Sequence, residues 1–298
     1  MAQRLKVLCL HGYMQNAKVF RQRTGALRKG LRNDVDFVYV TAPHAATDFP
    51  MMPVDGTLEA QVRQSAVARG AQNELEKQQQ QQQPGEQEQE QPGEQEQQPA
   101  VADAQDGEEL RPAAWWNTME GDVMPQIQHS TGFLCDVLRD QGPFDGIMGF
   151  SQGAAMTALL LGMIMNRNTE RIRLKDPGLH AFLAERVPER SACPRFAMLF
   201  CGYNPSVLPI ERLVAFGTKI PIPNLHVGGH KDAITPMYRG RQLATSFFGA
   251  PTIEFHGGGH GIATDNESIQ RYHNFMRAAV RPGSKAAGAP TSTDGGVA

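Results

Sequence analysis

The residues best suited to chemistry lie in the pentapeptide Gly149-Phe150-Ser151-Gln152-Gly153. A short apolar run precedes it, and an Ala- and Leu-rich segment with high helix propensity follows it. A serine between two glycines, at a turn from strand to helix, is typical of a nucleophile elbow, which exposes the serine hydroxyl. The two glycines satisfy the steric demand of so tight a turn. The pattern therefore predicts Ser151 as a nucleophile.

A serine nucleophile needs a base and an acid that orients the base. In hydrolases with this elbow the chain order is Ser, then Asp or Glu, then His. Asp232 follows a predicted strand and a pair of glycines, and it is the candidate acid. His260 closes a glycine-rich run after the next predicted strand, and it is the candidate base. Four further residues compete for these roles: His230 and His256 for the base, and Glu254 and Asp265 for the acid.

Backbone amides are expected to stabilise the oxyanion of an acyl-transfer reaction. One is the amide of Gln152, directly after the nucleophile. The other is the amide of Tyr13, with that of Met14 as the alternative, in the loop after the first predicted strand, where Gly12 permits a close approach of the backbone. His11 in the same loop is expected to brace it by hydrogen bonding rather than to take part in the chemistry.

Four residues are candidate walls of an acyl pocket: Met14, Trp115, Trp116 and Tyr203. Adjacent tryptophans cannot both face the core from a regular helix or strand. We therefore expect one of the pair to pack inward and the other to line the pocket. The alternative is that both anchor the chain after the low-complexity segment that precedes them.

Hydrophobic patterns predict strands that alternate with helices along the chain. The predicted strands are 5–10, 36–40, 145–149, 196–201, 222–227 and 251–255. The predicted helices are 17–32, 122–140, 152–165, 210–216, 236–248 and 265–279. Such alternation is typical of a parallel sheet with both faces covered. Ser151, Asp232, His260 and the 11–16 loop all follow predicted strands, so they should meet at the carboxyl edge of that sheet.

The segment VLCLHGYMQNAKVF, residues 7–20, resembles the opening of the family of serine hydrolase proteins. The elbow, the strand ends before Tyr203 and Asp232, and the run that ends at His260 match that family in the same order. The resemblance covers about residues 5–279 and is interrupted by one large insertion. It implies an α/β-hydrolase fold, with a mostly parallel central sheet and helices on both faces. It also implies esterase or thioesterase activity and a triad of Ser151, Asp232 and His260.

Composition divides the chain into one domain and two low-complexity segments. We predict a single α/β-hydrolase domain over residues 1–280, a Gln/Glu-rich insertion within it at 59–111, and a disordered tail at 281–298. Residues 78–98 are almost entirely Gln and Glu and contain the repeat PGEQEQ twice. So polar a tract has little to bury and should be disordered. The insertion is a candidate surface for a protein partner.

Charge, hydropathy and cysteine usage argue against several other classes of protein. The chain has a formal net charge of −2, and its basic residues are scattered, so no nucleic-acid module is expected. No apolar run is long enough for a membrane span, and the first is too short for a secretory signal. The four cysteines lack the spacing of a zinc site or a disulfide framework. We expect a reducing compartment, namely the cytoplasm with the nucleus as a further location.

These residues predict a two-step hydrolysis of carboxylic esters with short to long acyl chains, through an acyl-enzyme intermediate. No metal or other cofactor is expected. Two alternatives remain open. One is an acyl thioesterase that uses the same triad, and the other is a non-catalytic partner-binding module on a hydrolase scaffold.

Overall fold

The computed structural model describes residues 3–47, 111–117, 123–205 and 217–281. They belong to one compact unit that joins residues 1–47 to residues 107–298. Three predictions concern residues outside these ranges: the helix at 210–216, the insertion at 59–111 apart from Arg111, and the tail at 281–298 apart from Arg281.

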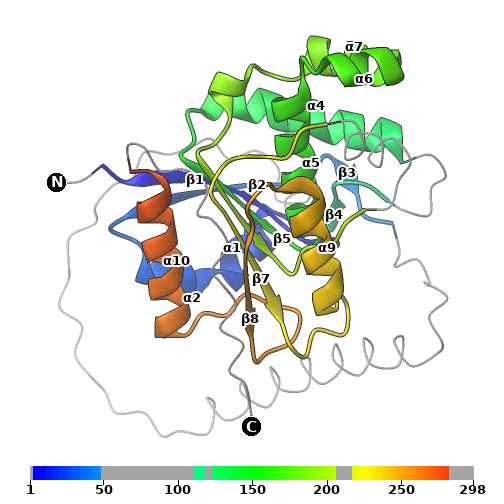
Figure 1. Ribbon diagram of the computed structural model, residues 1–298. Helices are drawn as coiled ribbons and strands as arrows, with labels where there is room; N and C mark the ends of the chain where they lie inside the picture. The colour runs from blue at the N-terminus through cyan, green and yellow to red at the C-terminus, as the bar shows by residue number, and fades with distance from the viewer. Residues whose placement is uncertain (1–2, 48–110, 118–122, 206–216, 282–298) are drawn as a thin grey trace, which may run out of the picture. The chain divides into compact units, whose positions relative to one another are not determined.

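Six strands form one parallel sheet with the order β2-β1-β5-β6-β7-β8 (Figure 1). Their bounds are β1 (Leu5–Leu10), β2 (Val35–Val40), β5 (Gly146–Phe150), β6 (Phe196–Phe200), β7 (Asn224–Gly229) and β8 (Thr252–His256). Each lies within two residues of its predicted range, and the predicted parallel sheet is confirmed. Gly228 and Gly229, expected in a loop, instead complete β7.

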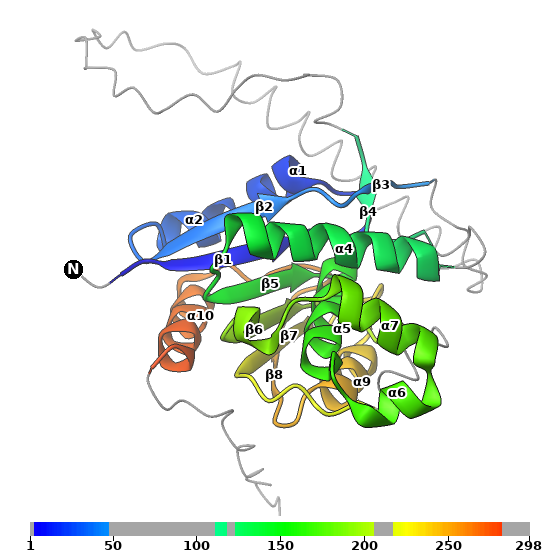
Figure 2. The ribbon, with the colours of Figure 1, turned by 90° about the horizontal axis from the view of Figure 1, so that it is seen from above.

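Helices cover both faces of the sheet, as the alternation of elements indicates (Figures 1 and 2). One face carries α1 (Ala17–Arg23), α2 (Gly25–Gly30) and α10 (Asn266–Ala279). The other carries α4 (Met124–Gln141), α5 (Gln152–Asn166), α6 (Glu170–Lys175), α7 (Pro177–Arg186) and α9 (Met237–Phe247). Among the described residues, no helix combines the length and apolar character needed to cross a membrane.

Two hydrophobic clusters lie on opposite faces of the sheet, and successive residues of a strand alternate between them. In β1, Leu8 and Leu10 pack into the cluster under α4 and α5, whereas Val7 and Cys9 pack into the cluster over α1, α2 and α10. β1 is therefore apolar on both faces, which explains its near-continuous hydrophobic sequence.

Three features depart from the predicted elements. The helix expected at 17–32 is broken at Thr24, whose hydroxyl donates to the Phe20 carbonyl (2.8 Å) and ends α1 before α2 begins. The stretch 166–194, for which no element was predicted, contains α6, α7 and a 3-10 turn at Arg190–Ala192. β3 (His44–Ala45) and β4 (Ala113–Ala114) form an unpredicted antiparallel pair that joins distant parts of the chain.

Candidate active site

Ser151 lies at the sharp turn between β5 and α5, as its sequence context predicts. Its backbone has φ 53° and ψ −116°, a combination that non-glycine residues rarely adopt and that is typical of a nucleophile elbow. Its amide donates to the Phe200 carbonyl (2.8 Å), which fixes the turn against β6. A Cβ atom at Gly149 would clash with the backbone of Gly153 and Ala154. Gly149 is therefore required because α5 approaches this position closely.

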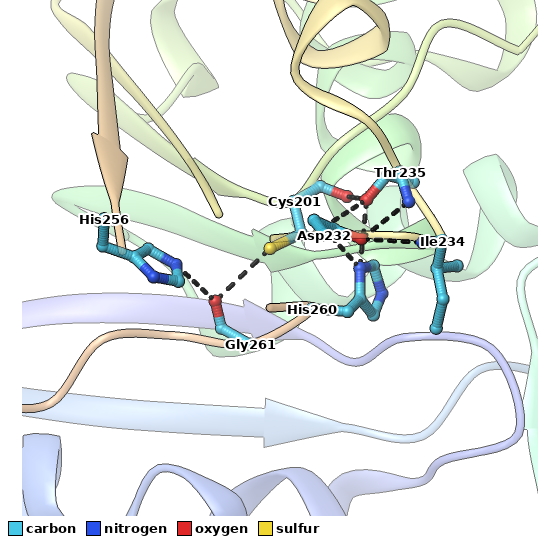
Figure 3. Close-up of polar contacts among 7 residues, drawn as sticks. All are labelled: Cys201, Asp232, Ile234, Thr235, His256, His260 and Gly261. Atoms are coloured by element: carbon cyan, nitrogen blue, oxygen red, sulfur yellow. Dashed lines mark hydrogen bonds and ion pairs between the residues drawn. The ribbon is translucent and has the colours of Figure 1, made fainter. Parts of the chain in front are cut away.

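Asp232 and His260 form a direct pair, with Nδ1 of His260 at 2.8 Å from Oδ2 of Asp232 (Figure 3). Oδ1 of Asp232 accepts hydrogen bonds from the amides of Ile234 (2.9 Å) and Thr235 (2.8 Å). Burial alone would raise the pKa of the Asp232 carboxyl, but His260 and Thr235 outweigh burial and lower it to about 2. An ionised Asp232 favours the proton on Nδ1 of His260, which leaves Nε2 as the nitrogen able to accept a proton.

The histidine, the elbow and the loop after β1 meet at the carboxyl edge of the sheet. The ring of His260 packs against Phe150, the residue before Ser151, with 5.0 Å between ring centroids. A Cβ atom at Gly12 would lie 3.3 Å from Cβ of Ser151 and 2.9 Å from the Phe150 ring. No side chain fits there, so the backbone of the loop after β1 runs directly beside Ser151.

The two amides predicted for an oxyanion hole belong to the residues that directly follow Ser151 and Gly12. Gln152 is the first residue of α5, so its amide has no acceptor within the helix. Tyr13 follows Gly12, and its hydroxyl donates to the Thr47 carbonyl (2.7 Å), which holds the loop. His11 braces the same loop, as expected. Its Nδ1 hydrogen-bonds the Gly12 carbonyl (2.7 Å), its Nε2 accepts from the Ala42 amide (2.9 Å), and burial lowers its pKa to about 4.

The competing residues are engaged elsewhere in the structure. His256 bonds the Gly261 carbonyl (3.1 Å) and the Gly258 amide (3.1 Å), and Figure 3 shows it on the far side of Gly261 from Asp232. The other three contact groups outside the acid–base pair: His230 the ring of Phe255, Glu254 the guanidinium of Arg271, and Asp265 the amide of Ser268. This placement favours His260 and Asp232 over the alternatives.

Both tryptophans are buried, which is compatible with the alternative that both anchor the chain. They follow the end of β4, where the backbone is no longer a regular strand and alternation does not apply. The side chain of Gln152 holds them: its Oε1 accepts from the Trp115 amide (2.9 Å), and its Nε2 donates to the Trp116 carbonyl (2.7 Å). The Trp115 indole donates to the His11 carbonyl (2.9 Å). Sequence reasoning missed this role of the Gln152 side chain.

The other two candidate pocket residues are Tyr203, which follows β6, and Met14, in the loop after β1. Tyr203 packs edge-on against Trp116, with 6.5 Å between ring centroids, and burial raises its pKa. Met14 is partly exposed and has φ 61°, in the left-handed region. The assignment of Met14, Trp115, Trp116 and Tyr203 to an acyl pocket stays a prediction.

One group of possible metal ligands occurs among the described residues: Cys201, Asp232 and His260, whose ligand atoms lie within 4.8 Å of one another. Burial and the Asp232 carboxylate raise the pKa of the Cys201 thiol to about 12, and the thiol donates to the Gly261 carbonyl (3.3 Å). Because Asp232 and His260 already bond each other, we assign no metal to this group.

Comparison with known proteins adds the family. The model of the serine hydrolase (FSH1) family matches residues 1–272. The chain belongs to this family. Its relatives include the esterase OVCA2 of Homo sapiens, 30% identical over 92% of this chain and 97% of that protein, and that of Danio rerio, 29% identical over 92% and 96%. The esterase CG5412 of Drosophila melanogaster is 27% identical over 92% of this chain and 74% of its own length.

Solved structures agree on the fold. The crystal structure of Arabidopsis thaliana SOBER1 superposes on this member of the serine hydrolase family with a TM-score of 0.52. The match covers 94% of this chain and all of that one, at 11% sequence identity. The fold neighbours are α/β-hydrolases, so the predicted fold class is confirmed.

Proposed function

We propose that this serine hydrolase is a carboxylic ester hydrolase that acts through Ser151, Asp232 and His260. The observation that carries the proposal is the 2.8 Å contact between His260 Nδ1 and Asp232 Oδ2 at the sheet edge that also holds the strained Ser151. A non-catalytic module would have no need for a strained serine beside an acid–base pair. The names of the relatives, which are esterases, support the same reaction class.

The proposed reaction has two steps. His260 Nε2 takes the proton of Ser151 as the serine oxygen attacks the ester carbonyl, and Asp232 stabilises the imidazolium that forms. The amides of Tyr13 and Gln152 donate to the oxyanion of the tetrahedral intermediate. His260 then gives its proton to the departing alcohol, which leaves an acyl-enzyme. Water, deprotonated by His260, attacks that ester and releases the acid and Ser151.

Labelling with a fluorophosphonate probe and hydrolysis of p-nitrophenyl esters test the proposal. We expect Ser151→Ala to abolish labelling and to lower kcat by roughly 10³-fold or more, with the fold preserved. Ser191→Ala is the matched control. Ser191 is exposed in the 3-10 turn that precedes β6, whereas the elbow contacts the opposite, carboxyl end of that strand. Persistent labelling or turnover in Ser151→Ala would refute the assignment of the nucleophile.

A series of esters and matched thioesters of graded acyl length then defines the substrate class. The proposal predicts that kcat/KM is higher for the oxygen esters at each length. A consistent preference for thioesters would replace it with the thioesterase alternative, which uses the same triad. Turnover of neither series by a folded, unlabelled protein would favour the partner-binding module.

A further inference from the structure

Thr235 lies where three loops of the site meet. Its hydroxyl oxygen is 2.8 Å from Oδ2 of Asp232, 3.0 Å from Nδ1 of His260 and 3.0 Å from the carbonyl oxygen of Cys201 (Figure 3). These partners follow β7, β8 and β6 respectively. Thr235 itself is buried. One hydroxyl group thus connects the acid, the base and the end of a third strand.

The two oxygens of Asp232 are held in different ways. Oδ1 is held by the backbone amides of Ile234 and Thr235, and these bonds remain whatever side chain stands at position 235. Oδ2 is held by side chains, those of His260 and Thr235, and the Cys201 thiol lies close to the same carboxylate. Without the Thr235 hydroxyl, Oδ2 would lose one of its hydrogen bonds, so rotation of the carboxylate about its last torsion would be less restricted.

The hydroxyl has one proton and two possible acceptors. The Asp232 carboxylate is charged and lies closer than the Cys201 carbonyl, so it is the stronger acceptor. When the proton points to Oδ2, a lone pair of the hydroxyl oxygen is free to face Nδ1–H of His260. Thr235 then restrains the acid and offers the imidazole N–H a second acceptor. Both effects favour the tautomer with Nε2 unprotonated.

We propose that Thr235 is a positioning residue of the acid–base pair, acting through its hydroxyl on Asp232 and His260. The inference rests on the proposed function, because it assigns Thr235 a part in the same triad. Removal of the hydroxyl should lower kcat by roughly ten- to a hundred-fold, the range expected for a hydrogen bond to a charged group. KM should stay within about twofold, because no contact with the ester is removed.

Two matched pairs of side chains separate the hydroxyl from the methyl group. Thr235 and Thr235→Val differ by the hydroxyl at nearly constant shape, as do Thr235→Ser and Thr235→Ala. The proposal predicts that Val and Ala lose activity in kcat, whereas Ser retains kcat within about threefold of the native protein. Thr131→Val is the control, because Thr131 is a buried threonine of α4 whose hydroxyl donates to the Ile127 carbonyl (2.7 Å). It should affect stability without changing kcat.

A structural role would produce the opposite pattern: Val would be tolerated, and Ser would be as damaging as Ala. That result, or a kcat of Thr235→Val within about twofold of the native value, would overturn the proposal. If Thr235→Val does not fold, the Ser and Ala pair still decides the question.

A spectroscopic measurement distinguishes failure of this inference from failure of the proposed function. In the Ser151→Ala background, with histidine labelled by ¹⁵N, the Nδ1 proton of His260 should appear at low field because it is bonded to a carboxylate. We expect Thr235→Val to shift this signal upfield or to broaden it by exchange with water, and Thr235→Ser to preserve it. An unchanged signal in Thr235→Val overturns the positioning role, whereas absence of ester turnover in the native protein bears on the proposed function alone.

Discussion

The side chain of Gln152 provides the sharpest test of how the elbow is joined to the rest of the fold. It bonds the Trp115 amide at 2.9 Å and the Trp116 carbonyl at 2.7 Å, and all three residues are buried. Gln152→Met keeps the length of the side chain and removes both polar atoms. Each buried backbone group that loses its partner costs about 1–3 kcal/mol, so the free energy of unfolding should fall by about 2–6 kcal/mol.

Urea denaturation monitored by tryptophan fluorescence measures this effect directly. Trp115 and Trp116 are the only tryptophans of the chain, so the signal reports the segment that Gln152 holds. The native emission of the variant should also shift to longer wavelength, because the segment is less firmly buried. Gln270→Met is the control: Gln270 is exposed on α10, and its side-chain amide donates to the side chain of Asn274 on the same helix (2.9 Å).

A change of about 0.5 kcal/mol or less is expected for the control, as for most surface substitutions. The reasoning fails if Gln152→Met loses less than about 1 kcal/mol, or no more than Gln270→Met does. That outcome would mean that the two backbone groups find other partners or water, and that the glutamine does not fix the tryptophan segment. A loss near the upper bound would be a large fraction of the roughly 5–15 kcal/mol that stabilises a typical domain.

Two further predictions concern acid stability and the Gln/Glu-rich tract. Burial lowers the pKa of His11 to about 4 and that of His226 to about 3, from an ordinary value of 6.5. As the pH falls, both histidines are therefore protonated in the unfolded chain before they are protonated in the folded protein. The free energy of unfolding should therefore decrease by about 1.4 kcal/mol per pH unit for each histidine between about pH 6 and pH 4, and His226→Phe should remove one of the two contributions in urea titrations. Replacement of residues 78–98 by a short Gly/Ser linker should leave both the melting temperature and kcat on a small ester unchanged, because so polar a tract adds little packing. A tenfold lower kcat at an unchanged melting temperature would contradict that reading.

The strands, and the meeting of the candidate site residues at one edge of the sheet, could be predicted because their signals are local. The elbow requires small residues on both sides of Ser151, and the structure shows why at Gly149, where α5 leaves no room for a Cβ atom. Asp232 and His260 follow buried strands of a parallel sheet, and the carboxyl ends of such strands meet at one edge. The order of strands and motifs in the sequence was therefore sufficient to predict that the loops of Ser151, Asp232 and His260 lie together.

The contacts that the sequence did not reveal join residues far apart in the chain. Gln152 meets the two tryptophans across 36 and 37 positions, and Thr235 meets Cys201 and His260 across 34 and 25. No periodicity or motif marks such pairs, because glutamine and threonine are common and most of them are solvated. Only the packed structure shows that these two are buried and bonded at the edge that carries Ser151.

The end of β6 illustrates how a strand without a reactive side chain can still shape the site. The Phe200 carbonyl fixes the Ser151 amide, and the next residue, Cys201, has φ 49°. In that conformation the Cys201 carbonyl lies 3.0 Å from the Thr235 hydroxyl, and its thiol donates to the Gly261 carbonyl (3.3 Å), directly after His260. Successive residues of one strand end thus contact the loops of the nucleophile, the acid and the base.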